Sequence, residues 1–108
     1  MKESKLLVKI FKALSNPHRL ELYLNIKEQQ KMDIEAGKEH TCFLSTLCSN
    51  INLGAPTLSH HLKELVNAEL VTTQKQGKFL ICSINEETEK VARDFFEGFS
   101  SSKKKREK

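Results

Sequence analysis

Four polar side chains between residues 55 and 67 have the types and the spacing needed to contact DNA. Apolar residues recur at i, i+4, i+7 and i+8 in this range, which predicts an amphipathic helix. A rotation of about 100° per residue places His60 opposite that apolar stripe. Imidazole, hydroxyl and ammonium groups on such a face can bond to base edges and phosphates in the major groove. The predicted contact residues are Thr57, Ser59, His60 and Lys63.

The start of this helix and its second histidine have structural roles. Gly54 is suited to the N-cap position, and Pro56 is suited to the first turn, where its missing N–H costs nothing. His61 falls beside the apolar stripe, close to Leu65, and is predicted to pack as a structural imidazole. Most amphipathic surface helices contact only water, so support for a DNA-binding role has to come from the neighbouring segments.

Those neighbouring segments predict a helix-turn-helix followed by a wing. A short helix is expected over residues 43–51, and a short break separates it from the helix at 55–67. Two strand-like runs, 70–74 and 79–84, are joined by a turn with Gly77 where a positive φ is wanted. The lysines at the two ends of that turn, which can reach phosphates beside the groove, are Lys75 and Lys78.

The cysteines point to a second kind of chemistry. Thiolates and neutral imidazole suit zinc-like ions, so Cys42, Cys48 and His40 are the candidate metal ligands. The same two cysteines are alternatively a thiol switch, because a disulfide between them would tether the helix that supports the helix at 55–67. Cys82 stands at a core-facing position of the second strand run and is predicted to be a buried structural thiol.

The composition predicts one domain and a separate basic tail. With 108 residues the chain has room for a single modest core. Its net charge of +4 comes entirely from residues 103–108, so residues 1–102 are formally neutral. We therefore expect a folded domain over 1–99 and a disordered tail over 100–108. The tail either stays solvated or adds sequence-independent attraction to phosphates.

The expected location is the cytoplasm. No apolar run is long enough for a membrane span, and the first residues lead into a helix pattern instead of a signal peptide. Three cysteines, an odd number without a paired framework, agree with a reducing compartment. No membrane partner is expected.

The first and last helices are predicted to carry more apolar surface than one small core needs. Residues 6–14 have apolar side chains at helical spacing, and Asn16 with Pro17 starts a second helix. Residues 27–40 indicate a frayed helix end and a surface loop. The last helix follows Asn85 and has a broad apolar side made of Val91, Ala92, Phe95, Phe96 and Phe99. We expect the terminal helices to bury each other across a two-fold homodimer, with burial inside one chain as the alternative.

Three separated motifs resemble the ArsR/SmtB family of winged-helix repressors. They are residues 13–20 (ALSNPHRL), 56–62 (PTLSHHL) and 68–71 (AELV). The resemblance implies a mainly α (α+β) winged helix-turn-helix with a two-stranded β-hairpin wing at 74–79 and a recognition helix at 55–67. It also implies a homodimer joined by its first and last helices. Finally, it implies repression of nearby genes, relieved by a metal ion, metalloid or redox signal.

The chain departs from this family at its sensing sites. The family's arsenic site resembles a Cys-x-Cys pair followed by a third thiolate, and the matching positions here are Phe43, Ser45 and Cys48. The other common site of the family needs Asp and His on the last helix, where this chain has Asp94 and Glu97 but no histidine. The usual metal sites are therefore not intact, and the cofactor stays unknown.

Two function classes other than DNA binding are an enzyme and a protein-interaction module. An enzyme is not expected, because nothing around the adjacent histidines indicates a nucleophile with an oriented base. A winged helix used only for protein contact is the alternative. We expect a dimeric repressor that binds double-stranded DNA at an imperfect inverted repeat, with half-sites about 10 base pairs apart.

Overall fold

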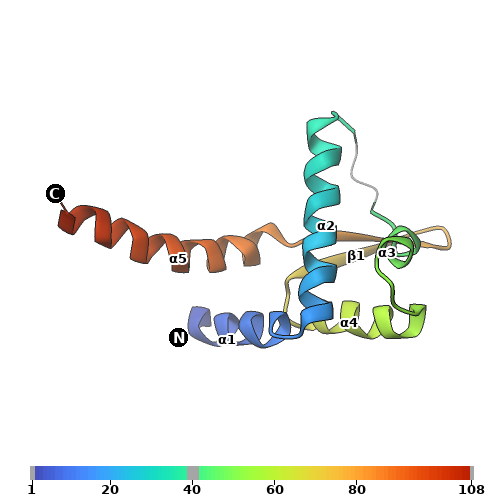
Figure 1. Cartoon of the computed structure of the whole chain (residues 1–108), viewed down its shortest axis with the longest axis horizontal. Coiled ribbons are helices and arrows are strands. Elements are labelled where there is room, and N and C mark those ends of the chain that lie inside the picture. Colours follow the sequence, from blue (N-terminus) through green and yellow to red (C-terminus); the bar gives the residue numbers. More distant parts are fainter. Residues whose placement is uncertain (1, 39–41, 108) are drawn as a thin grey trace.

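The described residues form five helices and one β-hairpin. The computed structural model describes residues 2–38 and 42–107, with side chains for 4–38 and 42–98. The elements in chain order are α1 (Lys2–Leu14), α2 (Pro17–Glu35), α3 (Leu44–Asn50), α4 (Ala55–Asn67), β1 (Val71–Gln76), β2 (Phe79–Ile84) and α5 (Glu86–Glu107) (Figure 1). This architecture confirms the predicted winged helix-turn-helix. Among the described helices, none has the length and apolar character to cross a membrane.

The turn between α1 and α2 forms as its sequence predicts. The Asn16 side chain caps α2, because its Oδ1 accepts hydrogen bonds from the backbone N–H of His18 at 2.9 Å and of Arg19 at 3.1 Å. Pro17 occupies the first turn, where no intrahelical donor is needed. α1 and α4 lie along the lower edge of the molecule in Figure 1, and α2 stands upright above them.

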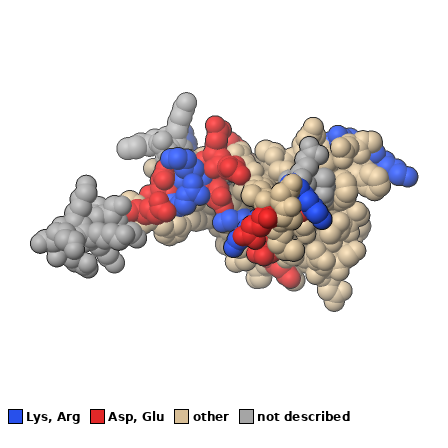
Figure 2. Space-filling model, turned by 90° about the horizontal axis from the view of Figure 1, so that it is seen from above, with Lys and Arg blue, Asp and Glu red and all other residues tan. Residues whose placement is uncertain are grey.

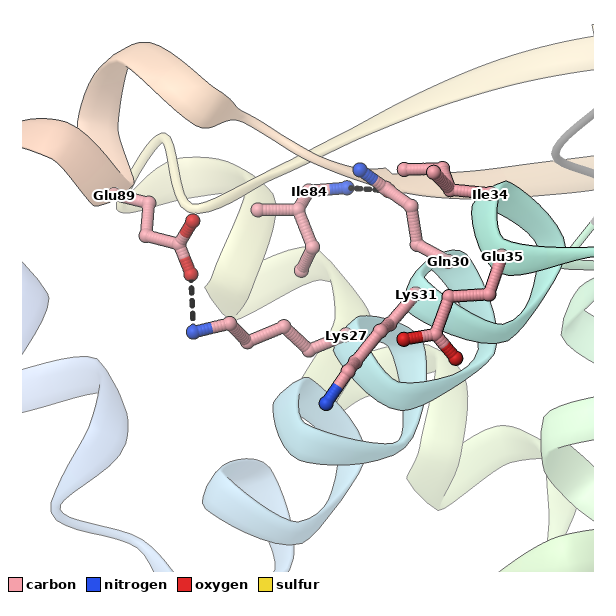
Figure 3. A pocket seen from close by; sticks show the side chains of 7 residues that line it. All are labelled: Lys27, Gln30, Lys31, Ile34, Glu35, Ile84 and Glu89. Carbon is pink, nitrogen blue, oxygen red and sulfur yellow. Dashed lines mark hydrogen bonds and ion pairs between the residues drawn. The ribbon is translucent and has the colours of Figure 1, made fainter.

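α2 is longer than the sequence predicts, since it stays helical to Glu35. Its second half has few buried apolar side chains and is held by polar contacts with distant residues. The Gln30 Oε1 accepts a hydrogen bond from the backbone N–H of Ile84 at 3.0 Å, and Lys27 forms an ion pair with Glu89 (Figure 3). The expectation of a frayed end beginning at residue 27 was therefore wrong. Residues 39–41 lie outside the described residues.

The first strand of the hairpin ends two residues later than predicted, at Gln76. β1 and β2 are antiparallel, and their register runs from Val71 opposite Ile84 to Gln76 opposite Phe79. The turn thus contains two residues instead of four, and Lys75 lies on β1. Gly77 has a φ of +65°, which confirms the reason for glycine at this place. An isolated bridge between Phe43 and Ile81 joins the hairpin to the residue before α3.

The core lies between the first four helices, α1 to α4, and the hairpin. Its fully buried large side chains are Ile10, Leu22, Ile26, Leu47, Ile51, Leu58, Leu65, Leu70 and Val71. α5 leaves this core and points away from it (Figure 1). Its bounds extend to Glu107 and so include residues for which the composition predicts disorder. The side chains of residues 99–108 are outside the described part, and the division at residue 99 stays a prediction.

Candidate nucleic-acid interface

α4 presents the polar face that its sequence predicts. Leu58, Leu62 and Leu65 are at most 4 % exposed and anchor the helix to the core. The opposite side is open to solvent along the whole helix. The structure places all four predicted contact residues on exposed positions of α4, and they are Thr57, Ser59, His60 and Lys63. Donors of three kinds therefore project from one rigid helix.

The first turn of α4 adds backbone donors to this face. Gly54 occupies the N-cap position without a side-chain capping bond, and Pro56 lies in the first turn. The first intrahelical hydrogen bond runs from the N–H of Leu58 to the carbonyl of Gly54, at 3.0 Å. The amides that precede it have no partner inside the helix, and a helix N-terminus of this kind attracts phosphate.

His61 is buried where α4 meets α2, as predicted. It is 8 % exposed, and its ring lies 6.1 Å from the ring of His18 and 5.8 Å from that of His60. Burial lowers the pKa of His61, and the positive charge of Arg19 adds to the effect. The imidazole is therefore neutral near pH 7. His61 supports the position of α4, whereas His60 remains open for contact.

The hairpin stands beside α4 with its lysines exposed. Lys75 lies opposite Leu80 in the β-ladder, and Lys78 lies in the turn. The turn end of the hairpin is held by aromatic packing that the sequence analysis missed, because the Phe43 and Phe79 rings are 5.2 Å apart. No local pattern reveals that pair, since the two residues belong to separate elements.

The cysteine at residue 42 has a neighbour that the sequence analysis did not identify. Cys42 lies opposite Cys82, because the Phe43–Ile81 bridge sets this register and the N–H of Cys82 donates to the carbonyl of Cys42 at 2.8 Å. Burial raises the pKa of the Cys42 thiol to about 11 and that of the Cys82 thiol to about 12. Both are protonated at neutral pH and poorly nucleophilic. The prediction that Cys82 is buried is confirmed.

The candidate metal ligands are only partly described. Cys48 lies half-buried on α3, and His40 is outside the described residues. Among the residues that the structure does describe, no group of three or more His, Cys, Asp or Glu side chains is placed to hold a metal ion. The set of Cys42, Cys48 and His40 therefore stays a prediction. On α5, Asp94 forms an ion pair with Lys90, with 2.8 Å between Oδ2 and Nζ.

A cluster of three phenylalanines joins α1 to α5. Phe11 lies 5.9 Å from Phe95 and 6.1 Å from Phe96, and the last two rings are 5.1 Å apart. We call these residues the phenylalanine cluster. Their exposed fractions are 41 %, 37 % and 58 %, and the neighbouring Val8 is 52 % exposed. An apolar surface of this extent on the two terminal helices is typical of an interface.

The face of the molecule that lies opposite α1 and α4 has mixed charge. Figure 2 shows this face from above, with acidic and basic side chains intermixed around α2 and α5. A hollow of about 330 Å³ on this side is lined by Lys27, Gln30, Lys31, Ile34, Glu35, Ile84 and Glu89 (Figure 3). Two of the lining residues, Lys27 of α2 and Glu89 of α5, form an ion pair with each other. This hollow therefore lies where α2 contacts α5.

Sequence comparisons show that this chain is similar to bacterial regulatory proteins. Residues 38–73 match the family model described as "Bacterial regulatory protein, arsR family". The chain is 39 % identical over 78 residues to the arsenical resistance operon repressor of Staphylococcus xylosus, which covers 72 % of this chain and 64 % of that protein. It is 29 % identical over 76 residues to the transcriptional repressor SdpR of Bacillus subtilis (strain 168), covering 70 % of this chain and 72 % of that protein.

Solved structures share the fold. An ArsR-like transcriptional regulator from Rhodococcus sp. RHA1 superposes with a TM-score of 0.71 at 20 % identity, covering 98 % of this chain and 90 % of that one. The transcriptional repressor BigR from Xylella fastidiosa gives a TM-score of 0.60 at 24 % identity, covering 88 % of each chain. At these identities the similarity shows the fold alone. The exposed face of α4 and the adjoining hairpin are thus carried by a scaffold known from regulators.

Proposed function

We propose that this chain is a member of the arsR family of bacterial regulatory proteins and a dimeric transcriptional repressor that binds double-stranded operator DNA in the cytoplasm. The observation that carries the proposal is the exposed polar face of α4 beside the hairpin. Its relatives are named as repressors, which also agrees with a regulatory and non-enzymatic role.

The proposed contacts follow from the position of each side chain. α4 enters the major groove, where His60 and Ser59 reach base edges and Lys63 reaches a base edge or a nearby phosphate. Thr57 lies in the first turn of α4, close to the free amides that attract a phosphate. The remaining contacts, made to the DNA backbone beside the groove, come from Lys75 and Lys78.

The proposed homodimer uses the phenylalanine cluster as its centre. A two-fold axis beside α1 and α5 covers these rings with their copies and places one α4 on each side. The two recognition helices then reach half-sites about 10 base pairs apart on the same side of the duplex. An imperfect inverted repeat is the operator that this symmetry demands.

The proposed release signal is a metal ion, a metalloid or an oxidant. One relative is named for arsenical resistance. In this chain Phe43 and Ser45 stand at two of the three thiolate positions of the family's arsenic site, so a signal of this kind has to use at least one residue outside that set. Cys42, Cys48 and His40 are the candidates. A screen of metal ions and oxidants for release of the protein from promoter DNA identifies the signal.

The test of DNA binding is a titration of duplex DNA at two salt concentrations. DNA from the promoter of the protein's own gene is compared with a scrambled duplex of equal length, and binding is followed by fluorescence anisotropy. A specific repressor prefers the promoter DNA and loses affinity steeply with salt. A module used only for protein contact shows no salt-dependent binding to either duplex, and that outcome refutes the proposal.

A further inference from the structure

We propose that a row of lysines on α1 is a second DNA-binding surface, which holds backbone phosphates beside the groove that α4 enters. The row consists of Lys5, Lys9 and Lys12. This inference rests on the proposed function, and it adds a surface that neither α4 nor the hairpin supplies.

The spacing of the row places it on one side of α1. The three lysines follow each other at i, i+4 and i+7, so their side chains lie above one another along one face. All three are exposed. The buried side of α1 carries Ile10 and Ala13, which are 1 % and 6 % exposed. Seven residues of helix extend the row over about 10 Å.

The lysine row borders the exposed face of α4. Lys9 and Lys12 line a surface hollow of about 230 Å³ together with Glu64 and Asn67 of α4. Asn67 is exposed and belongs to the same outward side of α4 as His60. Figure 1 shows α1 and α4 along one edge of the molecule. The row therefore lies on the DNA-facing side, whereas the phenylalanine cluster occupies another flank of α1.

Most of the positive charge of the row is open to a ligand. Lys9 approaches Glu69 at 4.0 Å, but both side chains are more than half exposed, and such pairs are weak. Among the residues with described side chains, Lys5 and Lys12 form no ion pair. Arg19 adds a further cation to the hollow, and its buried Nε has no hydrogen-bond partner within the described residues.

The lysine row lies apart from the most acidic turn of the described residues. Two acids, Glu64 and Glu69, line hollows beside the row, but three acids lie together at the start of α5. The first turn of α5 is acidic, with Glu86, Glu87 and Glu89, and it lies away from α4. The exposed lysines of α1 and α4 therefore offer a polyanion a surface that lies apart from this acidic turn.

Double-stranded DNA fits this row better than another partner does. It carries one charge per about 1.7 Å of helix axis, so about 10 Å of lysines spans several phosphates. Lysine is a compact point charge on a flexible stem, which suits phosphate and reads no base. In the proposed dimer α1 lies next to the two-fold axis, so the row meets the backbone between the two half-sites.

The test measures how strongly binding depends on salt. The full chain with Lys5→Ala, Lys9→Ala and Lys12→Ala is titrated with duplex DNA from about 50 to 200 mM salt, the range over which phosphate contacts dominate. Each lost phosphate contact reduces the slope of log K against log salt by about 0.9, so we expect a slope smaller by about 2 to 3. The loss of affinity is equal for promoter and scrambled DNA. Alanine is a good helix former, so α1 is kept.

A matched control removes three other exposed lysines. Lys31→Ala, Lys38→Ala and Lys90→Ala together change the net charge equally, but these residues lie on or after α2 and on α5. Their slope should stay that of the unaltered protein, since charges beyond about 10 Å are screened at 0.1 M salt. A row variant with arginine at all three positions should recover the original slope.

The outcomes separate this inference from the proposed function. If the unaltered protein shows no salt-dependent binding, the proposed function fails. If it binds and the alanine variant of the row keeps its slope, only the lysine row is refuted. Equal slopes for the row variant and the control variant refute it as well, because a general effect of net charge then explains the loss.

Discussion

The phenylalanine cluster allows a quantitative prediction about the homodimer. The change is Phe96→Ala, chosen because this ring is 58 % exposed in the single chain and touches Phe11 and Phe95. A whole phenylalanine side chain buries roughly 200 Å². About 100 Å² of apolar ring surface per protomer is therefore left for a partner, while the fold of the single chain depends on it little.

The expected loss follows from that area and from two-fold symmetry. At about 25 cal/mol per Å², removal of the ring costs about 2.5 kcal/mol in each protomer. An isologous interface contains it twice, so the dimer loses about 5 kcal/mol, which is more than a thousandfold in the dimer dissociation constant. Because buried area converts incompletely into affinity, we set the smallest acceptable change at about 100-fold.

The measurement is sedimentation equilibrium over a wide range of protein concentration. Phe79→Ala is the matched control, because this ring is 47 % exposed but lies on the hairpin against Phe43. It should leave the dissociation constant unchanged. A Phe96→Ala protein that dimerises as tightly as the unaltered chain refutes the assigned interface. So does an equal weakening by Phe79→Ala.

Three further predictions concern the recognition face, the buried histidine and the thiols. His60→Ala should reduce the preference for operator over scrambled DNA by about tenfold, since one base contact contributes about 1–3 kcal/mol, whereas Lys78→Ala should weaken both complexes equally in competition binding. Burial lowers the pKa of His61, so the unfolded chain binds the extra proton first. The contribution of His61 to the free energy of unfolding is then fully present above about pH 6.5. It decreases below that pH, by at most about 1.4 kcal/mol per pH unit. Urea titrations at several pH values should show this slope, and His61→Gln should reduce it; an unchanged slope in the variant contradicts the assignment. Iodoacetamide at neutral pH should label Cys48 before the two buried thiols, as read by mass spectrometry of the folded protein.

The elements with strong local signals were predictable from the sequence. The apolar stripe of α4 repeats over two turns and fixes both its buried side and its exposed side. Asn16 before Pro17 marks the start of α2, and Gly77 marks the hairpin turn, because each residue type meets a backbone requirement at its own position. The exposure of the predicted contact residues on α4 follows from the same periodicity.

The features that the sequence analysis missed depend on residues far apart in the chain. The end of α2 is held by Gln30 on Ile84 and by Lys27 on Glu89, and neither partner is near α2 in sequence. The position of Cys42 opposite Cys82 depends on a bridge between separate elements. The lysine row could not be identified from the net charge, because residues 1–102 are formally neutral. Only the position of α1 beside α4 shows that the row borders the exposed face of α4.

The bridge at Phe43 has a consequence for the DNA as well as for the protein. A two-stranded hairpin alone is marginally stable and free to tilt. Here the Phe43–Ile81 bridge, the Phe43–Phe79 ring contact and the bond from the Cys82 N–H to Cys42 fasten it beside α3. In the proposed DNA complex, the gap between the hairpin tip and α4 is then rigid, so a duplex of unsuitable width has to bend or twist to fill it. The free energy of binding then depends on how easily the duplex deforms, including at base pairs that no side chain contacts.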